Sequence, residues 1–207
     1  MGYFITFEGV EGCGKSTQAK LLAEHLKKKG YNVLLTREPG GPKISEQIRT
    51  ILLNAENTEM LPETELLLYM ASRSQHTGEW ILPALSNDFI VISDRYYDST
   101  IAYQGAARSI DMDVIKRITD YATYGLTPDI TFLIDIPAEL GLSRIAPDEA
   151  DRLEKESIEF HKKVRNGFLL LSKLQSKRFF VINGQNSIKD ISDIIKEEIN
   201  KKIKEKL

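Results

Sequence analysis

The sequence predicts a three-layer α/β/α fold built on a five-stranded parallel sheet. Five short apolar runs, rich in Ile, Val and Phe, are separated by segments in which apolar residues recur at helical spacing. The runs are mostly continuous rather than alternating, which is typical of strands buried on both faces. Strands that alternate with helices favour a doubly wound sheet. We expect strands at residues 3–7, 32–36, 89–92, 130–134 and 179–182.

Helices between the strands can be placed from apolar spacing and from the residues that begin or end helices. One helix begins at Lys15 and ends before Gly30, which stands where a C-terminal cap belongs. A long helical segment begins at Pro62 and runs to about residue 85. A third helix covers residues 111–124. The last helix has a buried stripe of isoleucines, which are Ile188, Ile191, Ile195, Ile199 and Ile203.

Length, charge and cysteine content limit the classes of function. With 207 residues the chain is expected to form one domain, residues 1–207. A net charge of −2 argues against general binding to nucleic acid or to acidic membranes. The single cysteine excludes an intramolecular disulfide framework and fits a reducing compartment. Because Met1 leads directly into a strand-like run and the apolar runs are strand-sized, we expect no signal peptide, no membrane span and a cytoplasmic location.

The strongest motif is a phosphate-binding loop between the first strand and the first helix. Residues 9–16 match the pattern G-x-x-x-x-G-K-[ST], which arises by chance in a chain of this length with a probability of about one per cent. Glycines let backbone amides converge on phosphate oxygens, and the helix N-terminus adds partial positive charge. Lys15 is expected to reach the β- and γ-phosphates of a nucleoside triphosphate, and the Ser16 hydroxyl to ligate Mg²⁺. The predicted ATP-binding residues are Gly9, Val10, Glu11, Gly12, Cys13, Gly14, Lys15, Ser16 and Thr17.

An acidic and a basic residue follow each other at the end of the third apolar run. Asp94 ends this strand, which would bring a carboxylate to the Mg²⁺ beside the phosphate loop. The Arg95 guanidinium would open onto the same edge of the sheet and could hold a phosphate with two parallel hydrogen bonds. A structural ion pair between the two is the alternative, and the phosphate loop favours the catalytic interpretation. The predicted metal ligands are Ser16 and Asp94, and the dispersed histidines indicate no other metal site.

Two pairs of residues at helical spacing could read a nucleobase. Tyr69 and Arg73 are four residues apart, so a flat ring and a planar cation share one helix face. Such a pair suits stacking on a base and hydrogen bonding to a ring carbonyl. Thr100 and Gln104 have the same spacing, and an amide presents both a donor and an acceptor to an imide edge. Taken alone, each pair is more often an ordinary feature of a helix surface.

Four motifs, in this order, resemble those of thymidylate kinases. They are FEGVEGCGKST at residues 7–17, TREPGG at 36–41, DRY at 94–96 and AYQG at 102–105. Together they cover most of the chain and are specific within nucleotide kinases. The resemblance implies a nucleotide kinase of the P-loop type that uses Mg²⁺ to transfer the γ-phosphoryl group of ATP to dTMP, giving dTDP and ADP. It also implies a homodimer.

The same resemblance assigns roles around the phosphate and the sugar of dTMP. Lys15, Arg95 and Asp94 would form the catalytic group. Arg95 and Arg49 would hold the phosphate of dTMP. Tyr103 would close the space beside C2′ and so disfavour a ribose, and Glu11 would meet the 3′-hydroxyl.

For the base, the resemblance implies that Tyr69 stacks on thymine and that Arg73 bonds a ring carbonyl. Thr100 and Gln104 would read the edge of the ring. The implied substrate-binding set is therefore Glu11, Arg49, Tyr69, Arg73, Arg95, Thr100, Tyr103 and Gln104.

One further arginine is expected at the transferred phosphoryl group. In the family that this chain resembles, the arginine comes either from the phosphate loop or from a lid. The loop position is Gly12 here, so a short lid at about residues 142–154 should provide it. This segment offers Arg144 and Arg152, and we include both among the catalytic candidates. Arg144 could instead anchor the lid, and Arg152 could pair with a neighbouring acid.

Other functions fit the sequence less well. A kinase for another nucleoside monophosphate, or for a deoxynucleoside, would not require the Tyr-Gln-Gly run or the acid within the phosphate loop. A non-catalytic nucleotide-binding module predicts decayed catalytic positions, but Lys15, Ser16, Asp94 and Arg95 are intact. A switch GTPase would need an Asn-Lys-x-Asp element, which the sequence lacks.

Overall fold

A computed structural model describes residues 2–146 and 150–206, with the backbone alone described for residues 204–206. Its centre is a sheet of five parallel strands in the order β2-β3-β1-β4-β5, with each strand in register with its neighbours. The strands are β1 (Tyr3–Glu8), β2 (Val33–Arg37), β3 (Ile90–Asp94), β4 (Ile130–Asp135) and β5 (Phe179–Asn183). The predicted five-stranded parallel sheet is thus confirmed.

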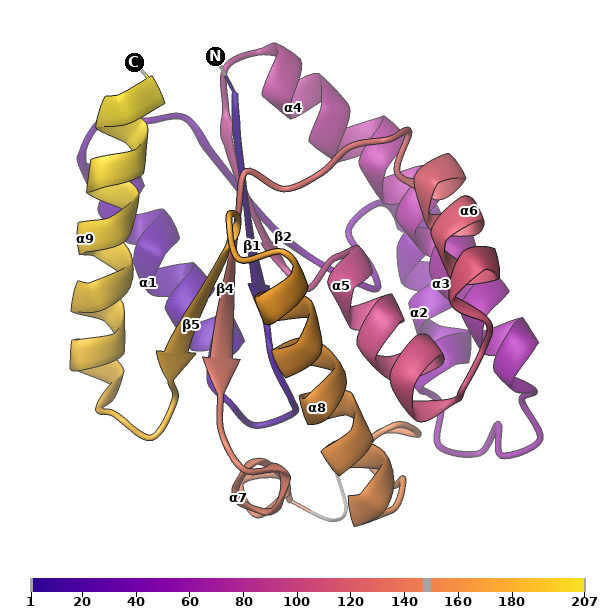
Figure 1. Cartoon of the computed structure of the whole chain (residues 1–207). Helices are drawn as coiled ribbons and strands as arrows, with labels where there is room; N and C mark the ends of the chain where they lie inside the picture. The colour runs from indigo at the N-terminus through magenta and orange to yellow at the C-terminus, as the bar shows by residue number, and fades with distance from the viewer. Residues whose placement is uncertain (1, 147–149, 207) are drawn as a thin grey trace.

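Each strand ends one or two residues later than the apolar run that predicted it. The last residue of every strand is polar, and three of these residues are Glu8, Arg37 and Asp94. Polar residues do not extend an apolar pattern, but they continue the hydrogen-bonded ladder. Because the strands are parallel, their last residues meet at one edge of the sheet, which is the lower edge in Figure 1.

Helices cover both faces of the sheet. Helices α1 (Lys15–Lys28) and α9 (Ile188–Lys206) lie on one face, at the left of Figure 1. Most of the other helices lie on the opposite face, at the right, and α7 lies at the lower edge. These helices are α2 (Lys43–Leu53), α3 (Pro62–His76), α4 (Leu82–Ser86), α5 (Tyr97–Thr100), α6 (Met112–Ala122), α7 (Ala138–Leu142) and α8 (Ile158–Leu174), with π-helical turns η1 (Thr77–Ile81) and η2 (Ile101–Ala107). The predicted three layers are confirmed.

The predicted helices are all present, with small differences at their ends. The segment that begins at Pro62 continues through α3, η1 and α4 without a break, and its π turn ends two residues before Pro83. The helix predicted at residues 111–124 is shorter, because Asp111 is its N-cap and accepts hydrogen bonds from the amides of Asp113 and Val114. The apolar spacing did not predict α2, α5 with η2, α7 or α8.

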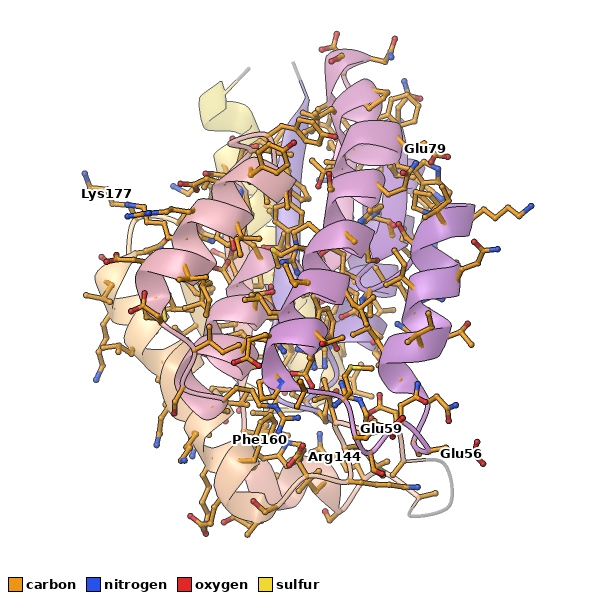
Figure 2. All side chains as sticks on the ribbon, turned by 90° about the vertical axis from the view of Figure 1, so that its right-hand side faces the viewer. Glu56, Glu59, Glu79, Arg144, Phe160 and Lys177 are labelled. Atoms are coloured by element: carbon orange, nitrogen blue, oxygen red, sulfur yellow. The ribbon has the colours of Figure 1, made fainter. Side chains whose placement is uncertain are left out.

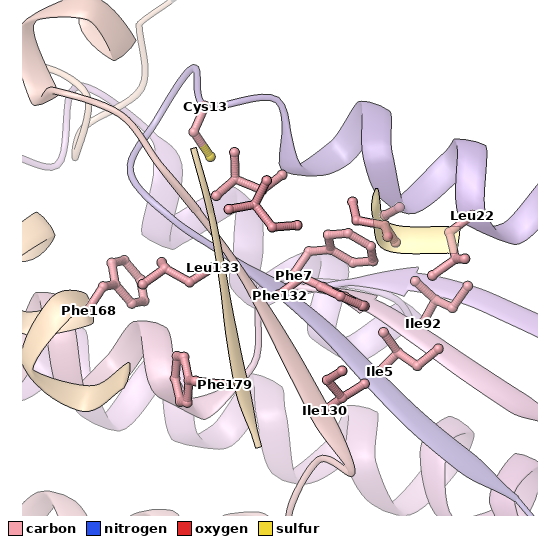
Figure 3. Packing of buried hydrophobic residues seen from close by; sticks show 14 of the residues in the cluster. Ile5, Phe7, Cys13, Leu22, Ile92, Ile130, Phe132, Leu133, Phe168 and Phe179 are labelled. Carbon is pink, nitrogen blue, oxygen red and sulfur yellow. The ribbon is translucent and has the colours of Figure 1, made fainter. Parts of the chain in front are cut away.

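The core fills both faces of the sheet. Neighbouring residues of a strand point to opposite faces, so Phe132 and Leu133 pack on different layers. Ile5, in register with Ile92, and Phe132 lie on the side of α1, whose Leu22 is buried against them (Figure 3). Leu133 lies on the side of α8 (Figure 3). Burial on both faces explains why the strands read as continuous apolar runs. No helix of the described residues is long and apolar enough to cross a membrane.

Candidate active site

The phosphate loop follows β1 and leads into α1, where the sequence predicts it. Gly12 has a φ of 66°, and a Cβ there would lie 2.1 Å from the carbonyl oxygen of Gly141 in α7. Glycine is therefore required at this position, both for the backbone conformation and for the close contact. Lys15 is buried, and its Nζ donates to Val10 O at 3.3 Å and to Glu11 Oε2 at 3.4 Å. The lysine thus lies along the loop whose amides would hold the phosphates.

Arg95 and Glu11 form an ion pair beside this loop. The hydroxyl of Tyr103 donates to Glu11 Oε1 at 2.8 Å, and Arg95 also donates to Ser99 Oγ at 2.9 Å. Burial alone would raise the pKa of Glu11, but the charges of Arg95 and Lys15 outweigh it and hold this pKa at about 2. Glu11 is therefore a carboxylate at neutral pH. Its partner is Arg95, so the structural ion pair considered between Asp94 and Arg95 is not the arrangement found in the described residues.

The backbone of Arg95 is held in the left-handed region, with a φ of 72°. Glu8, the last residue of β1, supports this segment: its Oε1 accepts from the amide of Tyr96 at 2.8 Å and its Oε2 from Ser99 Oγ at 2.6 Å. Glu8 is fully buried, and burial together with the nearby charge of Asp98 raises its pKa to about 8. Glu8 receives no role in the sequence analysis, although an acid at the end of an apolar strand could have indicated a buried polar partner.

Ser16 and Asp94 meet where the metal site was predicted. Ser16 Oγ donates to Asp94 Oδ2, and among the described residues Asp94 Oδ1 is buried without a hydrogen-bond partner. An unpaired buried carboxylate oxygen beside a serine hydroxyl suits a hard cation such as Mg²⁺. The described residues contain no group of three or more His, Cys, Asp or Glu that could hold a metal alone. The remaining ligands would have to be phosphate oxygens or water.

A pocket of about 200 Å³ begins at the phosphate loop and extends towards α3. It brings together residues that lie far apart in the sequence. Arg49, on α2, is half-buried at its wall and donates to Pro39 O at 2.7 Å. Of the residues that the sequence predicts for the site, those that line this pocket are Glu11, Lys15, Ser16, Arg49, Tyr69, Asp94, Arg95, Thr100, Tyr103 and Gln104.

Arg73 lies behind the wall of this pocket and is 1% exposed. Its Nε donates to Glu38 Oε2 at 2.7 Å, one terminal nitrogen to Thr100 Oγ1 at 2.8 Å and the other to Tyr96 O at 3.2 Å. Nδ1 of the fully buried His76 lies 3.0 Å from the other oxygen of Glu38. The interpretation of Arg73 as a surface residue is therefore wrong. Glu38 belongs to the TREPGG motif, but the motif alone does not reveal that this acid fixes the guanidinium.

Gln104 is also 1% exposed, so the surface interpretation of the second pair is wrong as well. Its amide nitrogen donates to Glu65 Oε1 at 2.8 Å. Glu65, on α3, is buried and also accepts from Arg108 at 3.1 Å. Sequence reasoning missed both Glu65 and Arg108. An acid on the buried face of the first turn of α3 would have pointed to a charged partner.

The two candidate lid arginines lie in different places. Arg144 follows α7, is exposed and donates to Gly12 O at 2.9 Å, so it touches the phosphate loop. Figure 2 shows it at the lower end of the molecule, where the strands end. Arg152 is buried, donates to Leu52 O at 2.9 Å and pairs with Glu65 at 2.7 Å. It does not line the pocket. Residues 147–149 of the predicted lid lie outside the described residues.

Fold and site together define a nucleotide kinase of the P-loop class. The sheet positions a phosphate loop, a serine and aspartate pair and an arginine at one edge, beside a pocket that extends away from the loop. In a comparison with protein families, the family described as thymidylate kinase matches residues 7–195.

The sequences of related proteins align with almost the whole chain. The thymidylate kinase of Geotalea daltonii is 52% identical over 91% of this chain and 92% of its own length. That of Caldanaerobacter subterraneus is 48% identical over 98% and 97%. The crystal structure of thymidylate kinase from Ehrlichia chaffeensis has a TM-score of 0.77 at 36% identity and covers 98% of both chains. The chain belongs to the thymidylate kinase family.

Proposed function

We propose that this protein transfers the γ-phosphoryl group of ATP to dTMP, giving dTDP and ADP. One observation carries the proposal: a single pocket runs from the phosphate loop past Arg95 to Tyr69 and Gln104. A nucleotide that filled it would have its phosphate beside the loop and its base at α3. The membership of the thymidylate kinase family supports dTMP as this nucleotide.

On the donor side, the amides of residues 9–17 and Lys15 hold the phosphates of ATP. Ser16 and the free oxygen of Asp94 would hold Mg²⁺, which would neutralise charge on the phosphates of ATP. Arg144 donates to Gly12 O of the loop, which places it beside the phosphates that the loop would hold. Arg152 could contribute only after release from Glu65, so Arg144 is the better candidate.

On the acceptor side, Arg95 and Arg49 hold the phosphate of dTMP. Arg95 is bound to Glu11 in the structure, so the incoming phosphate competes for, or shares, this guanidinium. Glu11 stays ionised and can accept a hydrogen bond from the 3′-hydroxyl, while Tyr103 packs beside C2′. The nucleophile is an oxygen of a phosphate dianion, so the reaction needs alignment and charge neutralisation more than a base.

The base lies against α3 and the helical segment that contains Thr100. Tyr69 stacks on thymine, and Arg73, fixed by Glu38, donates to a ring carbonyl. Thr100 and Gln104 complete the edge of the site. Arg73 does not itself line the pocket, and its terminal nitrogens already donate to Thr100 Oγ1 and Tyr96 O, so a bond to the base would be shared with one of these partners.

The active unit is a homodimer in the cytoplasm. Helix α3 contacts both α2 and α6, and all three expose large apolar side chains. Figure 2 looks onto this layer. Ile51 on α2 is 48% exposed, Leu67 on α3 57% and Tyr121 on α6 85%. A second copy covering this layer would remove that apolar surface from water. The free, buried thiol of Cys13 fits a reducing compartment.

The acceptor is tested with an assay that couples ADP release to a spectroscopic signal. The protein, ATP and Mg²⁺ are combined in turn with dTMP, dUMP, dCMP, dAMP and dGMP. Turnover with dTMP well above the others is expected. Turnover highest with another monophosphate would keep the phosphate-loop chemistry but reject the thymine-reading roles of Arg73, Thr100 and Gln104.

A further inference from the structure

Glu65 lies behind the base end of the pocket and has no role in the reaction described so far. It is 1% exposed, and it receives hydrogen bonds or ion pairs from three side chains. Gln104 donates to Oε1 at 2.8 Å, Arg108 reaches both oxygens at 3.3 and 3.1 Å, and Arg152 lies 2.7 Å from Oε2. Burial alone would raise the pKa of Glu65, but hydrogen bonds from Arg108 and Gln104 and the charges of the two arginines hold it below its ordinary value.

An ionised carboxylate only accepts hydrogen bonds, so it determines which end of the Gln104 amide faces it. The amide nitrogen must point to Glu65, and the amide oxygen must point the other way. Gln104 also lines the pocket, and no side chain or amide of the described residues donates to its Oε1. The pocket therefore presents an acceptor at this position rather than a donor.

We propose that Glu65 is a specificity-determining positioning residue, which fixes the Gln104 amide so that the pocket accepts a ring N–H and favours thymine over cytosine. This inference rests on the proposed function, since it concerns the choice among pyrimidine monophosphates. Glu65 itself does not touch the substrate and acts through Gln104.

The chemistry of the pyrimidine edge makes the inference specific. Thymine and uracil carry a hydrogen on N3, which can donate to the amide oxygen of Gln104. Cytosine has a lone pair on N3, which would face that oxygen and leave two acceptors opposed. A fixed amide therefore rejects dCMP. It does not distinguish dTMP from dUMP, because these differ only in the C5 methyl group.

Glu65→Gln is the informative substitution, since it keeps the shape of the side chain. Arg108 and Arg152 can only donate and would claim the remaining oxygen, which leaves an amide NH₂ facing Gln104. Gln104 would then turn its own oxygen to this NH₂ and present a donor to the pocket. The preference for a ring N–H would be lost or inverted.

The experiment measures kcat/KM with dTMP, dUMP and dCMP for the wild type and for Glu65→Gln. We expect the dTMP to dCMP ratio to fall by about tenfold or more, mainly through KM, and the dTMP to dUMP ratio to change less than about twofold. Asp98→Asn is the matched control, because Asp98 is a fully buried carboxylate paired with Arg178 and does not line the pocket. It should leave both ratios unchanged.

A fall of equal size with all three acceptors would mean that Glu65 only supports the fold, and would overturn the inference. If Glu65→Gln does not fold, Glu65→Asp replaces it: this variant keeps the charge for both arginines but withdraws the oxygen from Gln104. A wild-type dTMP to dCMP ratio in that variant would also overturn the inference. A wild type that does not prefer dTMP would instead refute the proposed function.

Discussion

At the scale of single residues, charged groups in this site are held by other charged groups. Glu11 pairs with Arg95, Glu38 with Arg73, and Glu65 with Arg152 while it also accepts from the neutral amide of Gln104. These acids are largely buried, so each needs a partner to stay ionised. The sequence predicted Arg73 and Gln104 from motifs and spacing. It did not predict Glu38 and Glu65 as the acids that fix these two side chains, because partners 35 and 39 residues away are brought together only by the fold.

Arg144 provides the sharpest test of the donor side. Its contact with Gly12 places it against the phosphate loop, so Arg144→Ala should lower kcat at least tenfold and change the KM for dTMP by less than about threefold. Steady-state kinetics measure both. Lys162→Ala, which removes an exposed cation paired with Glu139, is the control. A fall in kcat smaller than a few-fold would remove Arg144 from the mechanism.

Glu8 predicts a dependence of stability on pH. With a pKa of about 8 in the folded protein against an ordinary value of 4.5, the native state keeps a proton that the unfolded chain has lost between these values. The free energy of unfolding contributed by Glu8 is therefore full below about pH 4.5 and falls as pH rises towards 8, by up to about 1.4 kcal/mol per pH unit.

Glu8→Gln mimics the protonated side chain and should remove this component. Urea unfolding from pH 5 to 9 compares the two proteins, and the wild type should lose stability relative to Glu8→Gln up to about pH 8. Parallel curves would show that Glu8 is ionised in both states.

At the scale of elements, the sequence predicts the strands more completely than the helices. The apolar runs predicted all five strands, because burial on both faces leaves a clear pattern. They missed α8, whose apolar run Phe168–Leu171 lacks a clear period, although Ser157 caps its start by accepting from the amide of Phe160. They also missed α2 and the short α5 and α7, since helices of few turns carry little pattern.

Two effects could make glycine necessary at position 12, which are the close contact with α7 and backbone strain. A comparison with Gly14 separates them. Gly12 and Gly14 both have positive φ, of 66° and 94°. A Cβ at Gly12 would meet Gly141 O at 2.1 Å, but a Cβ at Gly14 would meet nothing within 4 Å. Gly12→Ala should therefore lower the melting temperature clearly more than Gly14→Ala. Thermal unfolding of the nucleotide-free proteins measures this, and equal losses would mean that strain alone makes glycine necessary.

At the scale of the whole molecule, the fold places the proposed site for two substrates at one end and an apolar layer on one side. We predict that light scattering gives twice the mass of one chain, because α2, α3 and α6 expose apolar side chains together. A charge at the exposed Tyr121, in Tyr121→Glu, should shift the mass towards that of a single chain. Leu174→Glu, at another well-exposed apolar position, on α8, should not. A wild type with the mass of one chain would reject the dimer.

The central claim is that one pocket aligns dTMP with ATP for direct phosphoryl transfer. The most direct measurement is phosphorus NMR of the products formed by the protein from ATP, Mg²⁺ and dTMP. We predict that dTDP and ADP appear in equal amounts and that inorganic phosphate stays near background. Consumption of ATP with release of inorganic phosphate and no dTDP would contradict the claim, because it would show that water rather than dTMP lies in line with the γ-phosphoryl group.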